Sequence, residues 1–181
     1  MLRVVSDGLW ADIKKLRAKN KPVFAAVAYV TSDSHLKFGR GDVLVCDASD
    51  QAIGSGQTTA AVLEAAVGRG AQVYSSPGLH AKVLVLGRVA VVGSANMSAS
   101  SASTLDEAAL ITDDARAVVG VRVLVEKLAR GGDRVDDDFI ARILKIKVRK
   151  ARNGSRRRRR VTVPESRAWL MSVIPVDDHE D

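Results

Sequence analysis

The chain has 181 residues, 46% of them apolar and 4% aromatic, with a net charge of +7 at pH 7. This length and apolar share are those of a globular domain with a sizeable core and room for an appendage, and they exclude a chain disordered throughout. Its single cysteine, Cys46, excludes an internal disulfide framework and a zinc site of several thiolates. No apolar run approaches the length of a membrane span, so we expect a cytoplasmic protein without stable membrane association.

The positive charge is concentrated near the end of the chain. Residues 141–160 contain 11 basic side chains and no acidic one, whereas the rest of the chain has 17 basic and 21 acidic side chains, a net charge of −4. We therefore divide the chain into a domain at residues 1–132 and a basic extension at 133–181, which is a helix followed by an Arg-rich segment. Such a segment attracts phosphate backbones in a salt-sensitive manner. The alternative is a solvated tail that binds nothing in particular.

The first 75 residues alternate between helical and strand patterns. Residues 6–18 have apolar side chains at helical spacing, and Ser6 is available as the N-cap. Strand, helix and strand of these lengths indicate the parallel units of an α/β fold. The other elements predicted here are buried strands at 23–29, 43–46 and 72–74, a loop at 48–56 and a helix at 58–68.

The pattern becomes antiparallel after residue 79. Residues 80–86 and 89–93 are predicted to form a hairpin around Gly87-Arg88. A strand at 107–111, a long helix from a cap at Thr112 to the glycines 131–132, and a helix that begins at residue 136 complete the prediction. The expected fold class is α/β, with a mixed β-sheet flanked by helices on both faces.

Four polar side chains gather on this hairpin. His80 and Lys82 stand two residues apart on one strand, and Ser94 and Asn96 stand two residues apart where the chain returns. Because side chains alternate along a strand, each pair shares a face of the sheet. The hairpin therefore offers an imidazole, an ammonium, a hydroxyl and a carboxamide within one small region.

Convergence of these groups depends on the length of the turn. A plain two-residue turn would pair Lys82 with Gly93 and place Ser94 on the wrong face. We therefore expect an odd-length connection, either a three-residue loop at 86–88 or a bulge, which places Ser94 opposite His80.

This set of groups suits a phosphodiester without the help of a metal. The imidazole of His80 is a nucleophile or proton shuttle near neutral pH. The ammonium of Lys82 and the amide of Asn96 can hold the non-bridging oxygens as negative charge builds up. Gly93 has no side chain, so a substrate can approach the backbone closely there, and we predict that Gly93 is a substrate-binding residue.

The same residues carry a family resemblance. The run resembles the phospholipase D superfamily signature, His-x-Lys-x4-Asp followed by Gly-Ser-x-Asn, and the resemblance covers roughly residues 23–111. Two departures are visible: Gly87 stands where the signature has Asp, and the spacing to Gly93 is one residue short. Members of the family vary at both points. The resemblance implies a phospholipase D-like catalytic domain at residues 1–132 with its active-site hairpin at 79–96.

The resemblance also implies a mechanism that needs two histidines. One histidine attacks phosphorus and forms a phosphohistidine, while the other protonates the leaving oxygen and then activates water. This chain has one complete copy of the motif, since the partial echo at residues 35–37 lacks the Gly and Asn that should follow. A homodimer, in which His80 of each copy meets at a two-fold axis, supplies the second histidine. An acidic residue after the Asn, here Glu107, would orient His80 through its second ring nitrogen.

The resulting prediction is a metal-independent nuclease without a cofactor. Its catalytic residues would be His80, Lys82, Ser94, Asn96 and Glu107. We expect nucleic acid as the partner, DNA ahead of RNA, bound partly through Arg156, Arg157 and Arg158. The alternatives are a phospholipase or phosphatidyl transferase, a catalytically silent nucleic-acid-binding module, and a nuclease module of a restriction or defence system.

Overall fold

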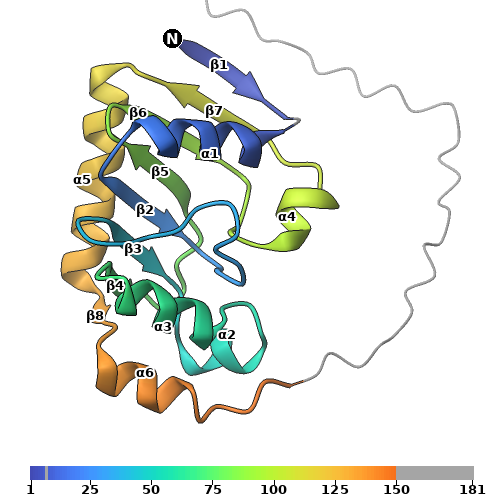
Figure 1. Ribbon diagram of the computed structural model, residues 1–181, viewed down its shortest axis with the longest axis vertical. Helices are drawn as coiled ribbons and strands as arrows, with labels where there is room; N and C mark the ends of the chain where they lie inside the picture. Colours follow the sequence, from blue (N-terminus) through green and yellow to red (C-terminus); the bar gives the residue numbers. More distant parts are fainter. Residues whose placement is uncertain (7, 150–181) are drawn as a thin grey trace, which may run out of the picture. The chain divides into compact units, whose positions relative to one another are not determined.

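The computed structural model describes residues 1–6 and 8–149, whose backbone forms a mixed eight-stranded sheet with helices around it (Figure 1). The strand order is β1-β7-β6-β5-β2-β3-β4-β8. The strands are β1 (Leu2–Val5), β2 (Val23–Val27), β3 (Val43–Cys46), β4 (Gln72–Ser75), β5 (Lys82–Leu86), β6 (Val89–Gly93), β7 (Ala109–Thr112) and β8 (Asp133–Arg134). The helices are α1 (Leu9–Lys19), α2 (Asp50–Gly54), α3 (Ala60–Gly68), α4 (Ala99–Ser103), α5 (Ala115–Gly131) and α6 (Asp137–Ile143).

The centre of the sheet confirms the parallel units predicted from the sequence. Strands β2, β3 and β4 run parallel, with α2 and α3 in the connection between β3 and β4. On the other side of β2, strands β5, β6, β7 and β1 are joined by antiparallel pairing. Lys82, the first residue of β5, pairs with Val27, the last residue of β2. The polar hairpin therefore opens at the carboxyl end of β2.

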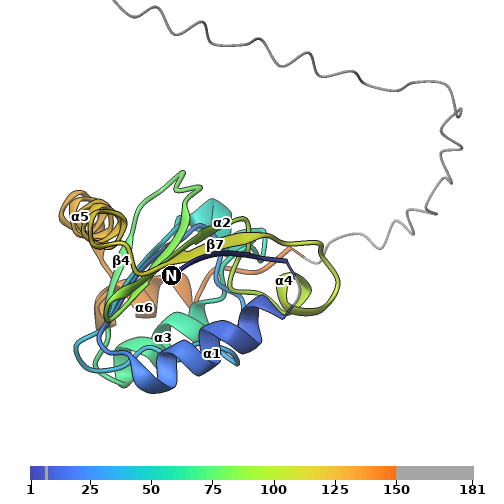
Figure 2. The same ribbon diagram turned by 90° about the horizontal axis from the view of Figure 1, so that it is seen from above.

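Helices cover both faces of the sheet, as expected (Figure 2). On one face α5 packs through Val125 against Val45 and Val83. On the opposite face Ile13 of α1 and Leu63 of α3 belong to a larger core, to which α2 and α6 also contribute. Both faces of the central strands are thus removed from water, which explains their almost continuous apolar sequence.

The β5–β6 turn corrects our prediction of an odd-length connection. The ladder closes on the two residues 87–88, without a bulge. Gly87 has φ of 56°, a left-handed conformation that glycine adopts without strain and that tight hairpin turns require. Continued by one position, the ladder brings Lys82 level with Gly93, which is the pairing that the prediction rejected.

Two helices begin two residues later than their predicted caps. The N-cap of α1 is Gly8 rather than Ser6, and the N-cap of α5 is Asp114 rather than Thr112. The carboxylate of Asp114 accepts a hydrogen bond from the backbone N–H of Ala117 at 2.9 Å, which satisfies one of the free donors of the first turn. The predicted loop at 48–56 contains α2, which is capped by Ser49.

The first part of the predicted extension belongs to the main core. Strand β8 pairs antiparallel with β4, and Ile140 and Ile143 of α6 are buried. The predicted boundary at residue 132 therefore falls inside the packed structure, because the apolar face of α6 covers α3. The Arg-rich segment with Arg156, Arg157 and Arg158 lies outside the described residues.

Within residues 1–6 and 8–149, no helix combines the length and the apolar character needed to cross a bilayer.

Candidate active site

The candidate site lies where β2, β5, β6 and β7 meet. Beyond the end of β2, the backbone N–H of Ala28 donates to the carbonyl of Ala81 at 2.9 Å, which extends the pairing with the chain before β5. Two residues further on, Val30 pairs in parallel with Met97. The segment that contains Ser94 and Asn96 is therefore fixed to the end of β2 as well as to β7.

His80 and Lys82 lie together at the start of β5. His80 is exposed and precedes the strand, which begins at Lys82 rather than at residue 80. The ammonium of Lys82 donates to the backbone carbonyl of His80 at 3.0 Å, so the lysine side chain turns back along the chain toward the histidine. Burial lowers the pKa of Lys82, and the negative charge of Glu107 opposes this by raising it. The charges of Lys82 and Glu107 therefore influence each other.

Glu107 is held by two hydroxyl groups. Ser94 Oγ donates to one of its carboxylate oxygens, and Ser101 Oγ of α4 donates to the other at 2.7 Å. Hydrogen bonds from hydroxyls to an ionised carboxylate are short and strong. The described contacts join Glu107 to these serines and contain no hydrogen bond from Glu107 to His80 of the same chain.

Ser94 reaches Glu107 because the chain bends at the end of β6. Regular alternation after the two-residue turn would put Ser94 on the face opposite Lys82. The strand ends at Gly93 instead, and the chain bends at Ser94. The backbone N–H of Ser94 donates to the carbonyl of Ala108 at 3.0 Å, and the N–H of Ala108 donates back to Ser94 Oγ at 3.1 Å. The bend brings Ser94 Oγ to Glu107, whereas the convergence of Ser94 with His80 and Lys82 stays a prediction.

Asn96 is oriented by its neighbours in a similar way. Its side-chain Oδ1 accepts a hydrogen bond from the backbone N–H of Tyr29 at 3.3 Å, and its own backbone N–H donates to Ser101 Oγ at 3.2 Å. Because the carbonyl oxygen of the amide is used in this way, the NH₂ group is left as the donor end. Ser101 thus links Asn96 with Glu107.

Gly93 is a glycine for a packing reason. A Cβ at this position would lie 2.6 Å from the carbonyl oxygen of Ala108 and 2.7 Å from Cβ of Ala109. Strand β7 therefore passes too close for any side chain. The contact of Gly93 with a substrate stays a prediction.

Two residues near the site were missed by the sequence analysis. Ser101 is buried and connects three parts of the site, but it lies in a run of serines and alanines without a periodic pattern. Trp10 of α1 is also buried, and it lines a small cavity of about 10 Å³ together with Lys82 and Gly93. A lone tryptophan in an amphipathic helix has the same appearance in the sequence as a core residue.

No group of three or more His, Cys, Asp or Glu side chains in the described ranges, 1–6 and 8–149, is arranged to hold a metal ion.

The fold and the arrangement of the hairpin define a class of protein. A mixed sheet between helices, with a His-x-Lys strand beside a returning Gly-Ser-x-Asn segment, is the architecture expected of a phosphodiesterase of the phospholipase D type. The family model described as "Cardiolipin synthase, PLD-like domain" matches residues 14–129. The chain therefore belongs to the phospholipase D-like domain family.

Solved structures support this assignment at the level of the fold. A phospholipase D family member, Nuc from Salmonella typhimurium, is similar with a TM-score of 0.58 and 11% identity over 74% of this chain and 97% of that one. NucT from Helicobacter pylori has a TM-score of 0.57 and 14% identity, and the match covers 74% of this chain and 98% of that one. TrmBL2, an archaeal chromatin protein with a novel mode of DNA binding, has a TM-score of 0.50 and 9% identity, and the match covers 74% of this chain and 54% of that one. A search of curated protein sequences found no match.

Proposed function

We propose that this protein is a metal-independent nuclease, which cleaves phosphodiesters through a phosphohistidine at His80 in a site shared by two copies of the chain. One observation carries the proposal. The exposed His80 stands beside Lys82, whose charge is coupled to Glu107, and Glu107 is hydrogen-bonded to Ser94 at the end of the neighbouring strand. These contacts support the proposal, because they link the residues that we assign as nucleophile, cation, hydroxyl and carboxylate.

The reaction would proceed in two displacements. A ring nitrogen of His80 attacks phosphorus, a P–N bond forms and the P–O bond to the leaving alcohol breaks. The His80 of a second copy gives its proton to the leaving oxygen. That second imidazole then removes a proton from water, whose oxygen attacks phosphorus and breaks the P–N bond, so that the first His80 is regenerated.

The other groups would stabilise the phosphate as its charge rises. Lys82 and the NH₂ group of Asn96 would bind non-bridging oxygens, since both are donors at the same end of the sheet. Ser94 and Glu107 form one unit. Burial lowers the pKa of Lys82, and the negative charge of Glu107 partly opposes this and so favours the charged form of the lysine. We also propose that Glu107 orients the imidazole of a His80 in the site formed by the two copies.

The requirement for a second copy follows from the count of motifs. The chain contains one complete His-x-Lys and Gly-Ser-x-Asn set, and the double displacement uses two histidines. A two-fold axis that passes close to His80 would bring two lysines and two asparagines around one phosphate. An exposed nucleophile is compatible with such an axis.

Nucleic acid is the proposed substrate because of the charge. The 11 basic side chains of residues 141–160, among them Arg156, Arg157 and Arg158, would bind phosphates along a strand without reading its sequence. The chromatin protein TrmBL2, which has a similar fold, binds DNA. We therefore place DNA ahead of RNA.

The test is a nuclease assay in excess chelator with wild type and His80→Asn. We expect wild type to cleave single-stranded or duplex DNA without added metal, and His80→Asn to lose activity by at least about a thousandfold while its unfolding midpoint is unchanged. His179→Asn serves as the matched histidine control. Acid-labile, alkali-stable phosphate on wild type, and a dimer in sedimentation, complete the expected result.

Several results would overturn the proposal. Wild-type rates in His80→Asn, or a requirement for added magnesium, would exclude His80 as the nucleophile of a metal-free reaction. Hydrolysis of phosphatidylcholine in preference to DNA would assign the same chemistry to a lipid. Salt-sensitive DNA binding without cleavage would favour a silent binding module.

A further inference from the structure

A buried carboxylate near the candidate site has no part in the proposed reaction. Asp47 directly follows β3 and is 8% exposed. None of the ion pairs within residues 1–6 and 8–149 includes it. A carboxylate withdrawn from water is unfavourable unless hydrogen bonds compensate for the lost hydration, so the partners of Asp47 indicate what the residue does.

Both carboxylate oxygens of Asp47 accept hydrogen bonds from the main chain. Oδ1 accepts from the backbone N–H of Ser49, the N-cap of α2, at 2.9 Å, and Oδ2 accepts from the N–H of Gly78 at 3.0 Å. A carboxylate has acceptors only, whereas the amide of an asparagine would turn its NH₂ group toward one of these two donors. The contacts therefore explain why this residue is an aspartate, and they join α2 to the loop between β4 and β5 (Figure 1).

A tight turn at residues 76–79 leads directly into His80. The N–H of its last residue donates to the carbonyl of its first residue at 3.1 Å. Gly78 has φ of 78°, and Pro77 followed by a glycine with positive φ is typical of a type II turn. The closing hydrogen bond does not use the N–H of Gly78, which donates to Asp47 instead. The carboxylate of Asp47 thus fixes the turn two residues before His80.

The main chain of Asp47 supports the segment on the other side of His80. Its N–H donates to the carbonyl of Ala28 at 3.0 Å, and the N–H of Ala28 donates to the carbonyl of Ala81 at 2.9 Å. Ala28 directly follows β2, which lies between β3 and β5 in the sheet. Gly78, before His80, and Ala81, after it, are therefore both connected to Asp47.

His80 depends on this support of its main chain. The residue is exposed, and the hydrogen bonds within the described part of the chain include its carbonyl, which accepts from Lys82, but not its imidazole. A displacement of about 1 Å at a reacting group can lower a rate about a hundredfold. The backbone on either side of His80 therefore decides where its ring stands.

We propose that Asp47 is a positioning residue for the nucleophile His80. Its carboxylate fixes the turn at residues 76–79 and its main chain fixes Ala81, so that His80 keeps one position beside Lys82. The inference rests on the proposed function, which assigns the attack on phosphorus to His80. In this role Asp47 acts through the main chain and makes no contact with the substrate.

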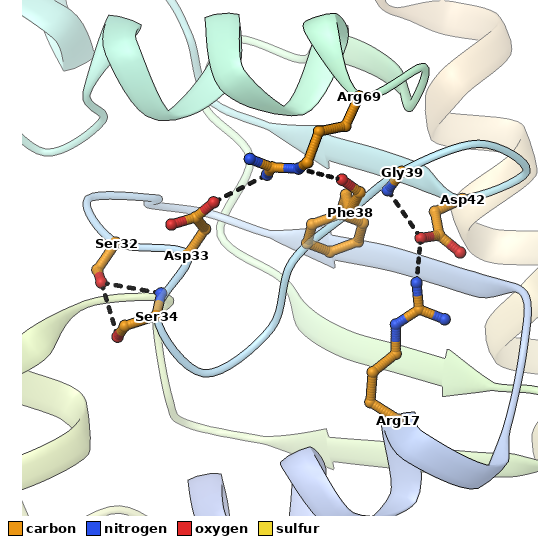
Figure 3. A network of polar contacts seen from close by, with 8 residues as sticks. All are labelled: Arg17, Ser32, Asp33, Ser34, Phe38, Gly39, Asp42 and Arg69. Atoms are coloured by element: carbon orange, nitrogen blue, oxygen red, sulfur yellow. Dashed lines mark hydrogen bonds and ion pairs between the residues drawn. The ribbon is translucent and has the colours of Figure 1, made fainter.

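The first test compares Asp47→Asn with Asp42→Asn. Asp42 directly precedes β3, is also buried, and accepts two main-chain N–H groups, those of Val23 and Gly39 (Figure 3). The two variants make the same chemical change at opposite ends of one strand, and both should lower the urea midpoint. Asp47→Asn should in addition lower kcat on a single-stranded DNA decanucleotide about a hundredfold with little change in KM, whereas Asp42→Asn should keep the wild-type kcat. Equal values of kcat in the two variants would overturn the inference.

A second pair of variants avoids any change in the core. Gly78→Ala places a methyl group in open space but strains the turn, because alanine adopts a positive φ only with an unfavourable free energy. Gly41→Ala is the control, since Gly41 has φ of 84°, is also exposed and has open space at its Cβ position. We expect kcat to fall at least about fivefold in Gly78→Ala and to stay at the wild-type value in Gly41→Ala. A wild-type kcat in both Gly78→Ala and Asp47→Asn would show that the turn does not position His80.

An NMR measurement makes the result independent of cleavage. In wild type the backbone amide of His80 should have an order parameter of about 0.85, the value of rigid backbone, and in Asp47→Asn it should fall toward about 0.6, where backbone is flexible. Asp42→Asn should keep the wild-type value. An unchanged order parameter in Asp47→Asn would overturn the inference even if the chain cleaves DNA. The expected loss of order in a chain that does not cleave DNA would instead count against the proposed function alone.

Discussion

Ser94 and Glu107, thirteen residues apart in the sequence, are joined by a hydrogen bond across the ends of β6 and β7. Ser101 holds the second oxygen of the same carboxylate and also accepts the backbone N–H of Asn96. The short helix α4, which contributes Ser101, therefore sets the relative positions of three predicted site residues. The contribution of α4 to the site comes from one buried hydroxyl group, that of Ser101.

Replacement of Ser101 by Ala should lower both the stability of the protein and its activity. The change removes two hydrogen bonds at a buried position, so we expect a loss of about 1–3 kcal/mol in the free energy of unfolding. Because Asn96 and Glu107 both lose a partner, kcat should fall about tenfold. Urea unfolding and a DNA cleavage assay measure the two effects.

The matched control is Ser103→Ala on the same helix. Ser103 is exposed and donates only to the carbonyl of Ala99 one turn earlier. Its replacement should change the free energy of unfolding by less than about 0.5 kcal/mol and leave activity as it is. Equal effects of the two replacements would contradict the role that we give to Ser101.

The ammonium of Lys82 should titrate at a lower pH than that of an ordinary lysine. Burial lowers the pKa of Lys82 below its usual value of 10.5, and the negative charge of Glu107 opposes this by raising it. Removal of that charge in Glu107→Gln should therefore lower the pKa of Lys82 further, while Asp106→Asn should leave it close to wild type. An NMR titration of the Lys82 side chain measures this pKa directly, separately from the protonation of His80 that the proposed reaction requires. Identical titrations of Lys82 in wild type and Glu107→Gln would contradict the coupling.

The sequence was sufficient for the parts of the site that depend on local pattern. The parallel pairing of β3 with β4 follows from two short apolar runs separated by a helical pattern, and β2 continues the parallel arrangement. Capping was less predictable, because Gly8 takes the place expected for Ser6. The helix begins where the chain leaves β1, a strand that exists through its pairing with β7.

The position of Ser94 was not predictable from the hairpin, because contacts with a later segment of the chain decide it. The two-residue turn depends on the backbone of Gly87 alone, and by itself it would separate Ser94 from Lys82. The bend at Ser94 depends on two hydrogen bonds to Ala108, which lies in a later segment of the chain. No periodicity within the hairpin contains this information.

Gly93→Ala should destabilise the protein and displace the site. The added Cβ would lie 2.6 Å from the carbonyl oxygen of Ala108 and 2.7 Å from Cβ of Ala109, so the two segments must separate. We expect a loss of about 1–3 kcal/mol in the free energy of unfolding, and a larger relative loss of activity because Ser94 is the next residue. Gly120→Ala is the control, since a Cβ there meets open space within α5, and it should stabilise the protein by about 0.5–1 kcal/mol. Similar shifts of the urea midpoint for both variants would contradict this explanation of Gly93.

The buried Asp42 should contribute far more to stability than the partly exposed Asp33, although each pairs with an arginine (Figure 3). Asp42 is 1% exposed, and its carboxylate accepts hydrogen bonds from Arg17 and from the N–H groups of Val23 and Gly39. Asp42→Ala leaves the half-buried guanidinium and two N–H donors without their acceptor, so we expect a loss of about 3–5 kcal/mol in urea unfolding.

For Asp33→Ala we expect a loss of about 1 kcal/mol or less, because its ion pair is accessible to water. Asp42→Asn, which keeps the shape and one acceptor oxygen, should fall between the two alanine variants. An Asp33→Ala variant as unstable as Asp42→Ala would show that burial does not decide the difference.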